Sequence, residues 1–242
     1  MERYTTWKWS SKASLLAGGT DSTLYYYCKR IMDVVVATLA LLLLLPVFLL
    51  IAILIRLDSA GPVFFVQERV GARRRSKHGR TVWKIENFRV YKFRSMVQDA
   101  DATAHQAYIK AFVNGSVQAS DEGGPKFKLS NDPRVTRVGH ILRKTSLDEL
   151  PQLVNVLKGE MSLVGPRPLP TYEVAEYQSW HRERLAALPG ITGLWQVQGR
   201  CEVSFEEQVQ MDIEYVRNQS LWQDIKILLS TIPAVVSGRG AE

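Results

Sequence analysis

The hydrophobic residues of this chain are concentrated in one uninterrupted segment near its start. Residues 34–55 contain no charged side chain, and a helix of this length is long enough to cross a bilayer core of about 30 Å. The segment is too long for the core of a signal peptide, and no small-residue cleavage site follows it. The pattern therefore predicts a membrane helix over residues 29–58, preceded by an N-terminal tail at residues 1–28.

Pro46 lies near the middle of this segment, where a proline removes one backbone hydrogen bond and bends a helix. Basic residues stand on both sides: Arg3, Lys8, Lys12, Lys29 and Arg30 before it, and Arg56, Arg69, Arg73, Arg74 and Arg75 after it. Because Lys and Arg favour the cytoplasmic side of a membrane, this symmetry favours a re-entrant helix over a straight spanning helix. The main objection is that backbone groups freed at the break need partners inside the membrane.

An aromatic cluster and two bases come directly before the apolar segment. The cluster is Tyr25, Tyr26 and Tyr27, and the bases are Lys29 and Arg30. Side chains of these types usually lie at the level of the lipid headgroups, so we expect Lys29 and Arg30 to contact the membrane surface. For residues 1–20, an unstructured leader is an equal alternative.

Short extended patterns after the membrane helix predict β-structure. Residues 61–69 have the pattern of a turn followed by an extended piece. Residues 82–85 and 88–94 then predict a small hairpin, with Glu86 and Asn87 at its bend.

Apolar residues recur at helical spacing through most of the remaining chain. Helices are predicted over residues 99–114, 133–144 and 171–188, after a capping box between Ser204 and Glu207, and from Ser220 onward. The last helix has an apolar face wide enough to lie on a bilayer, with Trp222 in contact with lipid. Residues 120–132 form a polar loop, either a flap or an ordinary surface loop. The expected fold is α+β and mostly helical, with a re-entrant membrane helix, a cytoplasmic domain over residues 59–242, a small β-hairpin and interfacial amphipathic helices.

The charge balance points to an anionic partner without choosing which one. The net charge is +7 and the pI is near 9.4, which suits nucleic acid, acidic lipid or a phosphorylated substrate. The basic run at residues 73–80 fits either contact with acidic lipid or a solvated loop. Two distant cysteines and four scattered histidines provide neither a disulfide framework nor a zinc motif. A reducing, cytoplasmic setting is the simpler interpretation.

Residues 140–159 contain the closest grouping of charged residues that could form an active site. Arg143 and Lys144 come just before two adjacent carboxylates, Asp148 and Glu149, where a helix is expected to begin. The spacing of Ser146 and Glu149 fits a capping box. Pro151 is tolerated only near a helix start, so a cap one or two residues after Ser146 is the alternative. One interpretation is that both acids only complement the helix dipole. The other is that they stay ionised, because the helix start and the two bases lower their pKa values, and so can attack an electrophile or hold a cation.

Arg167 lies between two prolines in the sequence Gly165-Pro166-Arg167-Pro168. Each proline fixes its own φ and restricts the residue before it, so this guanidinium is held on a stiff backbone. A rigid arginine suits a phosphate. Two arginines beside a carboxylate pair fit phosphoryl transfer, in which positioning and charge neutralisation do most of the catalysis.

Four motifs together resemble one known family. They are KRIMD at residues 29–33, VYKFRSM at 90–96, SLDELPQLVNVLKGEMSLVGPRPL at 146–169 and PGITGLWQVQGR at 189–200. These motifs resemble the bacterial sugar transferases, the monotopic polyprenyl-phosphate phosphoglycosyl transferases that start glycan assembly on a lipid carrier. The resemblance runs from Lys29 to about Ile232. Family members often have a small polar residue before the helix-breaking proline, where this chain has Leu45.

The resemblance implies transfer of a phospho-sugar from a UDP-sugar to polyprenyl phosphate, with release of UMP, at the cytoplasmic face of the bacterial inner membrane. Asp148 is then expected to attack the sugar-side phosphate, and Asp148 and Glu149 to hold Mg²⁺. Glu149 orients Asp148, shares the metal or accepts a proton; the sequence leaves these roles open. The residues expected to bind substrate are Arg143, Lys144, Arg167, Arg200, Lys92, Arg94, Asp212 and Asp224.

The expected partners are a UDP-sugar, polyprenyl phosphate and membrane lipids, without nucleic acid. Two alternatives remain open. One is a membrane-anchored binding or scaffold protein with a basic, lipid-facing surface and no catalysis. The other is a metal-dependent glycosyltransferase, which would release UDP instead of UMP.

Overall fold

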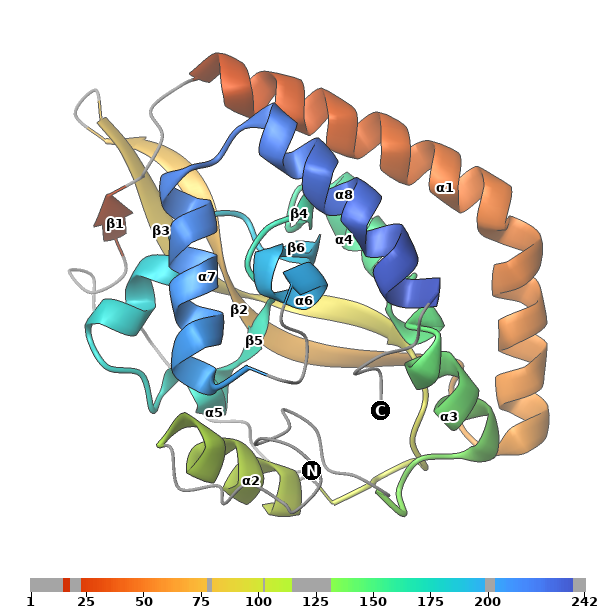
Figure 1. Cartoon of the computed structure of the whole chain (residues 1–242). Coiled ribbons are helices and arrows are strands. Elements are labelled where there is room, and N and C mark those ends of the chain that lie inside the picture. The colour runs from red at the N-terminus through yellow and green to blue at the C-terminus, as the bar shows by residue number, and fades with distance from the viewer. Residues whose placement is uncertain are drawn as a thin grey trace.

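The computed structural model describes residues 15–17, 23–77, 80–101, 103–114, 132–198 and 203–236. The fold is mostly helical with a few strands (Figure 1). The α-helices are α1 (Thr23–Asp58), α2 (Thr103–Val113), α3 (Arg137–Lys144), α4 (Gln152–Lys158), α5 (Thr171–Val174), α6 (Leu194–Gln198), α7 (Phe205–Arg217) and α8 (Leu221–Val236). The 3-10 helices are η1 (Leu147–Glu149) and η2 (Trp180–Leu185). The strands are β1 (Leu15–Ala17), β2 (Phe64–Lys77), β3 (Arg80–Phe93), β4 (Ser162–Val164), β5 (Leu169–Pro170) and β6 (Gly190–Thr192).

A long hairpin formed by β2 and β3 is the centre of the larger sheet, whose order is β1-β3-β2-β5. The two strands pair antiparallel from Phe64 opposite Phe93 to Lys77 opposite Arg80. The predicted bend at Glu86 and Asn87 is therefore wrong: both residues pair within the hairpin, with Gly71 and Val70. The alternation of side chains that predicted two short strands continues through this pair, so β3 is one strand.

Helix α1 runs along the outer edge of the molecule and changes direction partway along its length (Figure 1). Pro46 lies inside this 36-residue helix and supplies the physical cause of a bend. Among the described residues, α1 is the one helix long and apolar enough to cross a membrane, and 11% of its most hydrophobic window is buried. Many apolar side chains of α1 are exposed, among them Leu39, Leu42, Leu43, Leu45, Leu49, Leu50, Ile53, Leu54 and Leu57.

One narrow face of α1 packs on the rest of the protein. Ala37 joins the main core, which is formed mainly by β3, α4, β4 and α7. Ile51 and Ile55 join a second cluster with Phe93 and Leu142. At its end, the carboxylate of Asp58 accepts a hydrogen bond from a backbone N–H at the start of α3 at 3.1 Å. The membrane-type helix is thus docked on the domain at both of its ends.

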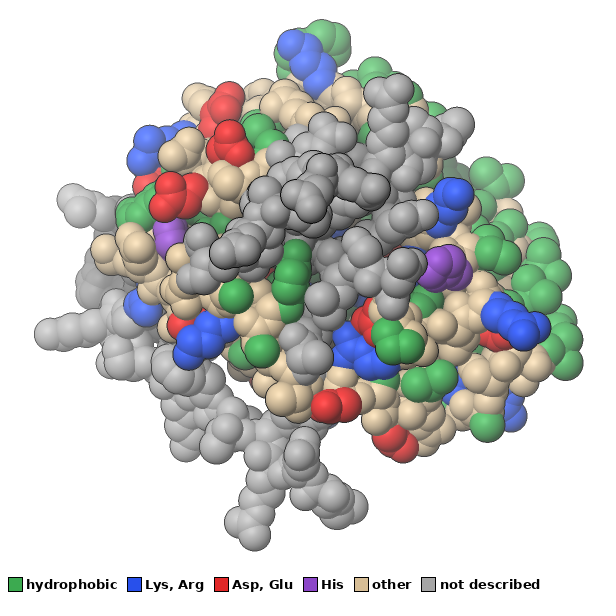
Figure 2. Space-filling model, turned by 60° about the horizontal axis from the view of Figure 1, so that its bottom comes forward, with side chains coloured by type: hydrophobic (Ala, Val, Ile, Leu, Met, Phe, Trp, Pro, Cys, Tyr) green, Lys and Arg blue, Asp and Glu red, His purple; other side chains and the backbone are tan. Residues whose placement is uncertain are grey.

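Helix α8 packs against α1 and extends the apolar surface (Figure 1). Trp222, Ile225, Leu229 and Ile232 of α8 are exposed, Trp222 at 65%. Their spacing of three or four residues puts them on one face of the helix. Figure 2 shows hydrophobic side chains gathered along the edge of the molecule formed by α1. These exposed faces are suited to lipid, so the membrane contact of Trp222 remains a prediction compatible with the structure.

The predicted helix over residues 171–188 is wrong, because the structure has only α5 and η2 in this region. The break allows buried polar side chains to find partners: the imidazole Nδ1 of His181 accepts from the N–H of Gln178 at 3.2 Å. The capping box between Ser204 and Glu207 is confirmed at the start of α7. Of the polar loop predicted at residues 120–132, only Asp132 is described.

Candidate active site

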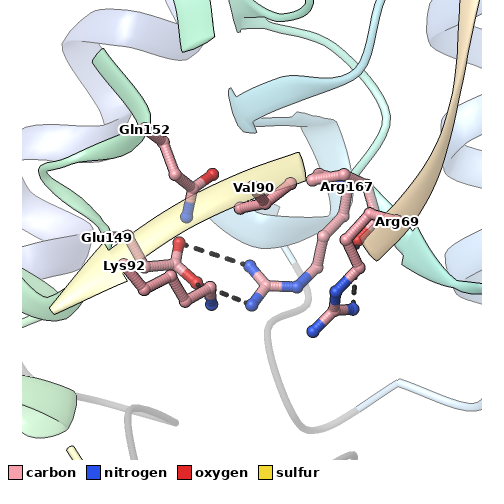
Figure 3. Close-up of a pocket in the computed structure, with 7 residues that line it drawn as sticks. Arg69, Val90, Lys92, Glu149, Gln152 and Arg167 are labelled. Atoms are coloured by element: carbon pink, nitrogen blue, oxygen red, sulfur yellow. Dashed lines mark hydrogen bonds and ion pairs between the residues drawn. The ribbon is translucent and has the colours of Figure 1, made fainter. Parts of the chain in front are cut away.

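Glu149 lines a pocket together with side chains from the β2–β3 hairpin, from α4 and from the loop between β4 and β5 (Figure 3). Its Oε1 accepts from Lys92 Nζ at 2.7 Å and from Arg167 Nη2 at 2.7 Å, and its Oε2 lies 3.4 Å from Arg167 Nη1. Lys92 belongs to β3, Glu149 to η1, and Arg167 to the loop between β4 and β5. Each side chain of this trio is about 15% exposed, so the trio is mostly sheltered from water.

The carboxylate pair is presented by η1 instead of the start of an α-helix. Ser146 has a left-handed conformation with φ 57°, and its side chain makes no capping hydrogen bond, so the predicted box with Glu149 is wrong. A non-glycine residue with positive φ is uncommon and costs about 1–3 kcal/mol. This residue turns the chain sharply between α3 and η1. The α-helix α4 begins later, with Pro151 as its N-cap.

The loop that carries Arg167 is fixed by close backbone packing. The N–H of Gly165 donates to Thr192 O at 2.9 Å, and the N–H of Gly190 donates to Pro166 O at 2.8 Å. A Cβ atom on Gly165 would collide with the carbonyl oxygen of Leu188. Only glycine allows this approach, and the flanking prolines then hold the guanidinium of Arg167 toward Glu149.

The pocket keeps Glu149 ionised. Burial alone would raise the pKa of Glu149, but the charges and hydrogen bonds of Arg167 and Lys92 hold it well below its usual range. Burial, reinforced by nearby Arg167, lowers the pKa of Lys92, against the opposing effect of Glu149. The site therefore contains a buried anion that is already neutralised by two cations.

Arg69 is a third cation in this pocket, and the sequence analysis did not select it. Burial and the charge of Arg167 lower the pKa of Arg69 to about 10. Its guanidinium is held by Gln67 Oε1, at 2.6 Å from Nη2, and by Pro168 O, at 3.3 Å from Nη1. Only the pairing of β2 with β5 brings it beside Arg167 (Figure 3), and no short motif signals that pairing. Three cations around one or two carboxylates leave an excess of positive charge that suits an anionic ligand.

Asp148 is half-buried on η1, directly before Glu149. Its charge acts on both Lys92 and Arg167. Arg143 comes from the last turn of α3 and is half-buried, with Nη1 enclosed and without a hydrogen-bond partner among the described residues. Lys144 is exposed. The structure thus brings Asp148, Glu149, Lys92 and Arg167 together, whereas Arg200 lies outside the described residues.

Three residues predicted to bind substrate have structural partners instead. Arg94 is buried and donates to the backbone of the turn after α1, including Ser59 O at 2.7 Å. Asp212 is fully buried in an ion pair with Arg184. Asp224 is fully buried and accepts from Lys29 Nζ at 2.8 Å. These side chains are enclosed by partners, so direct substrate binding by Arg94, Asp212 or Asp224 does not fit this geometry.

Lys29 and Arg30 do not face the membrane surface, contrary to the prediction. Lys29 is 4% exposed and is paired with Asp224. Arg30 donates to the carbonyl oxygens of Val156 and Leu157, at 2.5 and 2.7 Å, at the end of α4. Both side chains fold back from α1 onto the domain because buried carboxylate and carbonyl groups are available there.

The Lys29–Asp224 pair gives a testable result for stability. Replacing Asp224 by Leu should destabilise the protein by about 3–5 kcal/mol, because the ammonium of Lys29 would remain buried without its carboxylate. Adding Lys29→Met should recover much of this loss. Thermal unfolding in detergent measures both effects, with Glu183→Gln in the exposed Arg217 pair as the near-neutral control. Equal stability of the single and double variants would contradict this account.

Asp148 and Glu149 were predicted to hold Mg²⁺, but their surroundings in the structure differ. Both oxygens of Glu149 already face cations, so a metal role for Glu149 does not fit. Among the described residues, no group of three His, Cys, Asp or Glu side chains is placed to hold a metal. Mg²⁺ commonly binds through one or two carboxylates together with substrate phosphates and water, and Asp148 fits that weaker kind of site.

The structure combines a membrane-type helix with a domain whose pocket contains cations and carboxylates. This combination is typical of membrane-associated enzymes that act on phosphorylated substrates. The chain belongs to the bacterial sugar transferase family, whose model matches residues 24–238, and it is a phosphoglycosyl transferase.

Several curated proteins are similar to it. The Exopolysaccharide production protein ExoY of Rhizobium meliloti is 43% identical over 213 residues, covering 88% of this chain and 87% of that protein. The undecaprenyl-phosphate galactose phosphotransferase of Salmonella typhimurium is 42% identical over 89% of this chain and 42% of that protein. The UDP-glucose:undecaprenyl-phosphate glucose-1-phosphate transferase of Escherichia coli is 41% identical over 84% of this chain and 39% of that protein. The chain therefore spans nearly all of the first relative and about two fifths of the other two.

Proposed function

We propose that this protein transfers a phospho-sugar from a UDP-sugar to undecaprenyl phosphate or a similar polyprenyl phosphate, with release of UMP, and so starts the assembly of an exopolysaccharide or another glycan. The observation that carries the proposal is the ionised Glu149 held between Lys92 and Arg167, with Asp148 next to it. The names of the relatives from Salmonella typhimurium and Escherichia coli support the same donor and acceptor classes.

The reaction proceeds in two displacements. A carboxylate oxygen of Asp148 attacks the sugar-side phosphorus of the UDP-sugar, and the bond from that phosphorus to the bridging oxygen breaks, so that UMP leaves with the bond's electron pair. An oxygen of the polyprenyl phosphate then attacks the same phosphorus. The bond to Asp148 breaks, which gives a polyprenyl diphosphate sugar and restores the carboxylate. Carboxylates form such acyl phosphates in other enzymes.

The surrounding cations make this attack feasible. An anionic nucleophile and a diphosphate repel each other, and Arg167, Lys92 and Arg69 reduce that repulsion in a sheltered site. Glu149 holds Arg167 and Lys92 in fixed positions beside Asp148. Nη1 of Arg143 is enclosed and has no hydrogen-bond partner within the described part of the chain, so we assign it to a phosphate oxygen.

Asp148 would hold Mg²⁺ together with the phosphates of the substrate. The ion supplies charge neutralisation at the diphosphate. Arg167 and Lys92 carry out the same task from the protein side, and they also exclude Glu149 as a ligand by occupying its oxygens.

A re-entrant α1 with both ends at the cytoplasmic face would hold the site where a lipid phosphate and a soluble nucleotide sugar can meet. Pro46 inside α1 and the docking of both ends of α1 on one domain support this topology. Single cysteines placed at Ser10 and Ser59 should both react with an impermeant thiol reagent from the cytoplasmic side only. Reaction of the two positions from opposite sides would exclude the re-entrant form.

The activity assay combines purified protein in lipid nanodiscs with a UDP-sugar, Mg²⁺ and undecaprenyl phosphate. The proposal predicts release of UMP together with a lipid diphosphate sugar. Release of UDP would instead indicate a glycosyltransferase, and a scaffold protein would release neither nucleotide. Screening several UDP-sugars in this assay identifies the donor.

A further inference from the structure

One turn of α1 contacts three separate parts of the domain. We call Lys29, Arg30 and Asp33 the docking turn. Lys29 contacts α8 through Asp224, whose carboxylate also accepts from Tyr25 at 3.0 Å and from Tyr215 at 2.7 Å. Lys29 and Asp33 are 4% and 1% exposed, respectively. The docking turn is thus an internal polar contact near the N-terminal end of a membrane-type helix.

Arg30 connects the docking turn to the segment that carries the carboxylate pair. Its two terminal nitrogens donate to Val156 O and Leu157 O at 2.5 and 2.7 Å. These carbonyls belong to the last turn of α4, where backbone acceptors are unsatisfied and the helix dipole favours a cation. Helix α4 begins three residues after Glu149, so Arg30 holds the far end of the rigid element that follows Glu149.

Asp33 connects the same turn to the segment that carries Arg167. Its Oδ1 accepts from the N–H of Leu163 at 3.0 Å in a buried position. Leu163 is in β4, four residues before Arg167, and the neighbouring Val164 O lies 3.1 Å from the hydroxyl of Tyr215. Buried polar groups are costly to separate from their partners, so this contact restricts where β4 lies.

We propose that Arg30 and Asp33 are positioning residues that set the separation of Glu149 and Arg167. The two halves of the ion pair come from different segments, α4 with η1 and β4 with its loop. Both segments are tied to residues one helical turn apart on α1, and a helical turn is a rigid spacer. The inference rests on the proposed function, because it concerns the ion pair to which that function assigns catalysis.

Through the docking turn, the position of α1 on the domain would therefore determine the separation of Glu149 and Arg167 in the pocket. If either tie is lost, Glu149 and Arg167 should separate slightly. Arg167 would then be displaced from the phosphate that it neutralises in the proposed function, and turnover should fall in a protein that stays folded.

The test compares turnover for UMP release by the full chain in nanodiscs, in the wild-type background and in an Arg167→Lys background. Arg30→Gln and Asp33→Ala should lower turnover about tenfold to a hundredfold in the wild-type background. They should have little further effect once Arg167 is replaced, because residues that act through one partner are not additive. Asp33→Asn keeps an oxygen for the N–H of Leu163 and should restore most of the activity. Ile31→Ala, an exposed position on the same turn, is the matched control and should behave as wild type.

A purely structural role gives a different result. Loss of folded protein lowers turnover by the same factor in both backgrounds. Thermal unfolding and membrane fractionation report folding directly, and Arg30→Lys, which keeps the charge and one donor group, serves if Arg30→Gln does not fold. An equal factor in both backgrounds for the folded Arg30 and Asp33 variants would overturn the inference. If wild type itself releases no UMP, the proposed function fails instead.

Discussion

Asp148→Asn should lower UMP release by at least about a thousandfold, because a neutral amide cannot displace UMP from the diphosphate. Asp148 is half-buried on a short 3-10 helix, so the variant should still fold and insert into membranes. The measurement is the initial rate of UMP formation with saturating undecaprenyl phosphate. Thermal unfolding of the same sample separates loss of chemistry from loss of structure.

The matched control for this variant is Asp101→Asn. Asp101 is an exposed acid whose carboxylate accepts hydrogen bonds from Thr103 at the start of α2. Its replacement should leave UMP release unchanged. A folded Asp148→Asn protein that keeps more than about a tenth of the wild-type rate would contradict the nucleophilic role.

Arg167→Gln should have the second largest effect, a fall of about a hundredfold to a thousandfold in turnover. Loss of one preorganised cationic donor from a sheltered site commonly has this size. Arg167→Lys should recover only part of the rate, because an ammonium cannot reproduce the two contacts to Glu149. Arg217→Gln, in an exposed ion pair with Glu183, is the control and should be close to wild type.

Arg167→Gln should also change how the free energy of unfolding depends on pH. The pKa of Glu149 is held down by Arg167 and Lys92 against the effect of burial. A depressed folded-state pKa contributes stability above the unfolded-state pKa, and this contribution is lost as the pH falls through the folded-state value. Arg167→Gln should therefore reduce stability most at neutral pH and least in acid. Denaturation curves at several pH values measure the difference, and a pH-independent loss would show that Arg167 does not hold the Glu149 pKa down.

Local patterns were sufficient to predict several parts of this protein. The long uncharged segment predicted the membrane-type helix α1 and where it ends, and Pro46 predicted its bend, because both depend only on composition and on the chemistry of proline. The helix begins at Thr23, before the predicted start at Lys29. The spacing of Ser204 and Glu207 predicted a capping box that the structure confirms. Asp148, Glu149, Lys92 and Arg167 were selected from motifs, and the structure brings them together, although their catalytic roles remain predictions.

The errors share one physical cause, which is that partners distant in sequence decided the outcome. Lys29 and Asp224 are 195 residues apart, and their ion pair is formed only when α1 packs against α8. Arg69 reaches the pocket through a strand pairing that has no local signal. Ser146 was expected to cap a helix through its side chain, whereas it adopts a left-handed conformation and makes no capping hydrogen bond.

The buried acids on α7 and α8 illustrate the same limit. Asp212 and Asp224 were expected to bind substrate as part of what the family resemblance implied, with a helix-surface charge as the alternative for Asp224. In the structure their charges are balanced by Arg184 and Lys29. A sequence cannot distinguish a carboxylate that binds substrate from one that meets a buried cation, because both occupy inward positions of a helix.

The intact mass of the protein after incubation with a UDP-sugar, Mg²⁺ and no lipid acceptor tests the central claim most directly. The account predicts an added mass equal to one phospho-sugar, located on Asp148 by peptide mapping and removed when undecaprenyl phosphate is supplied. Asp148→Asn should show no added mass. A wild-type protein that turns over with acceptor present, yet never gains this mass under rapid quench, would contradict a covalent intermediate.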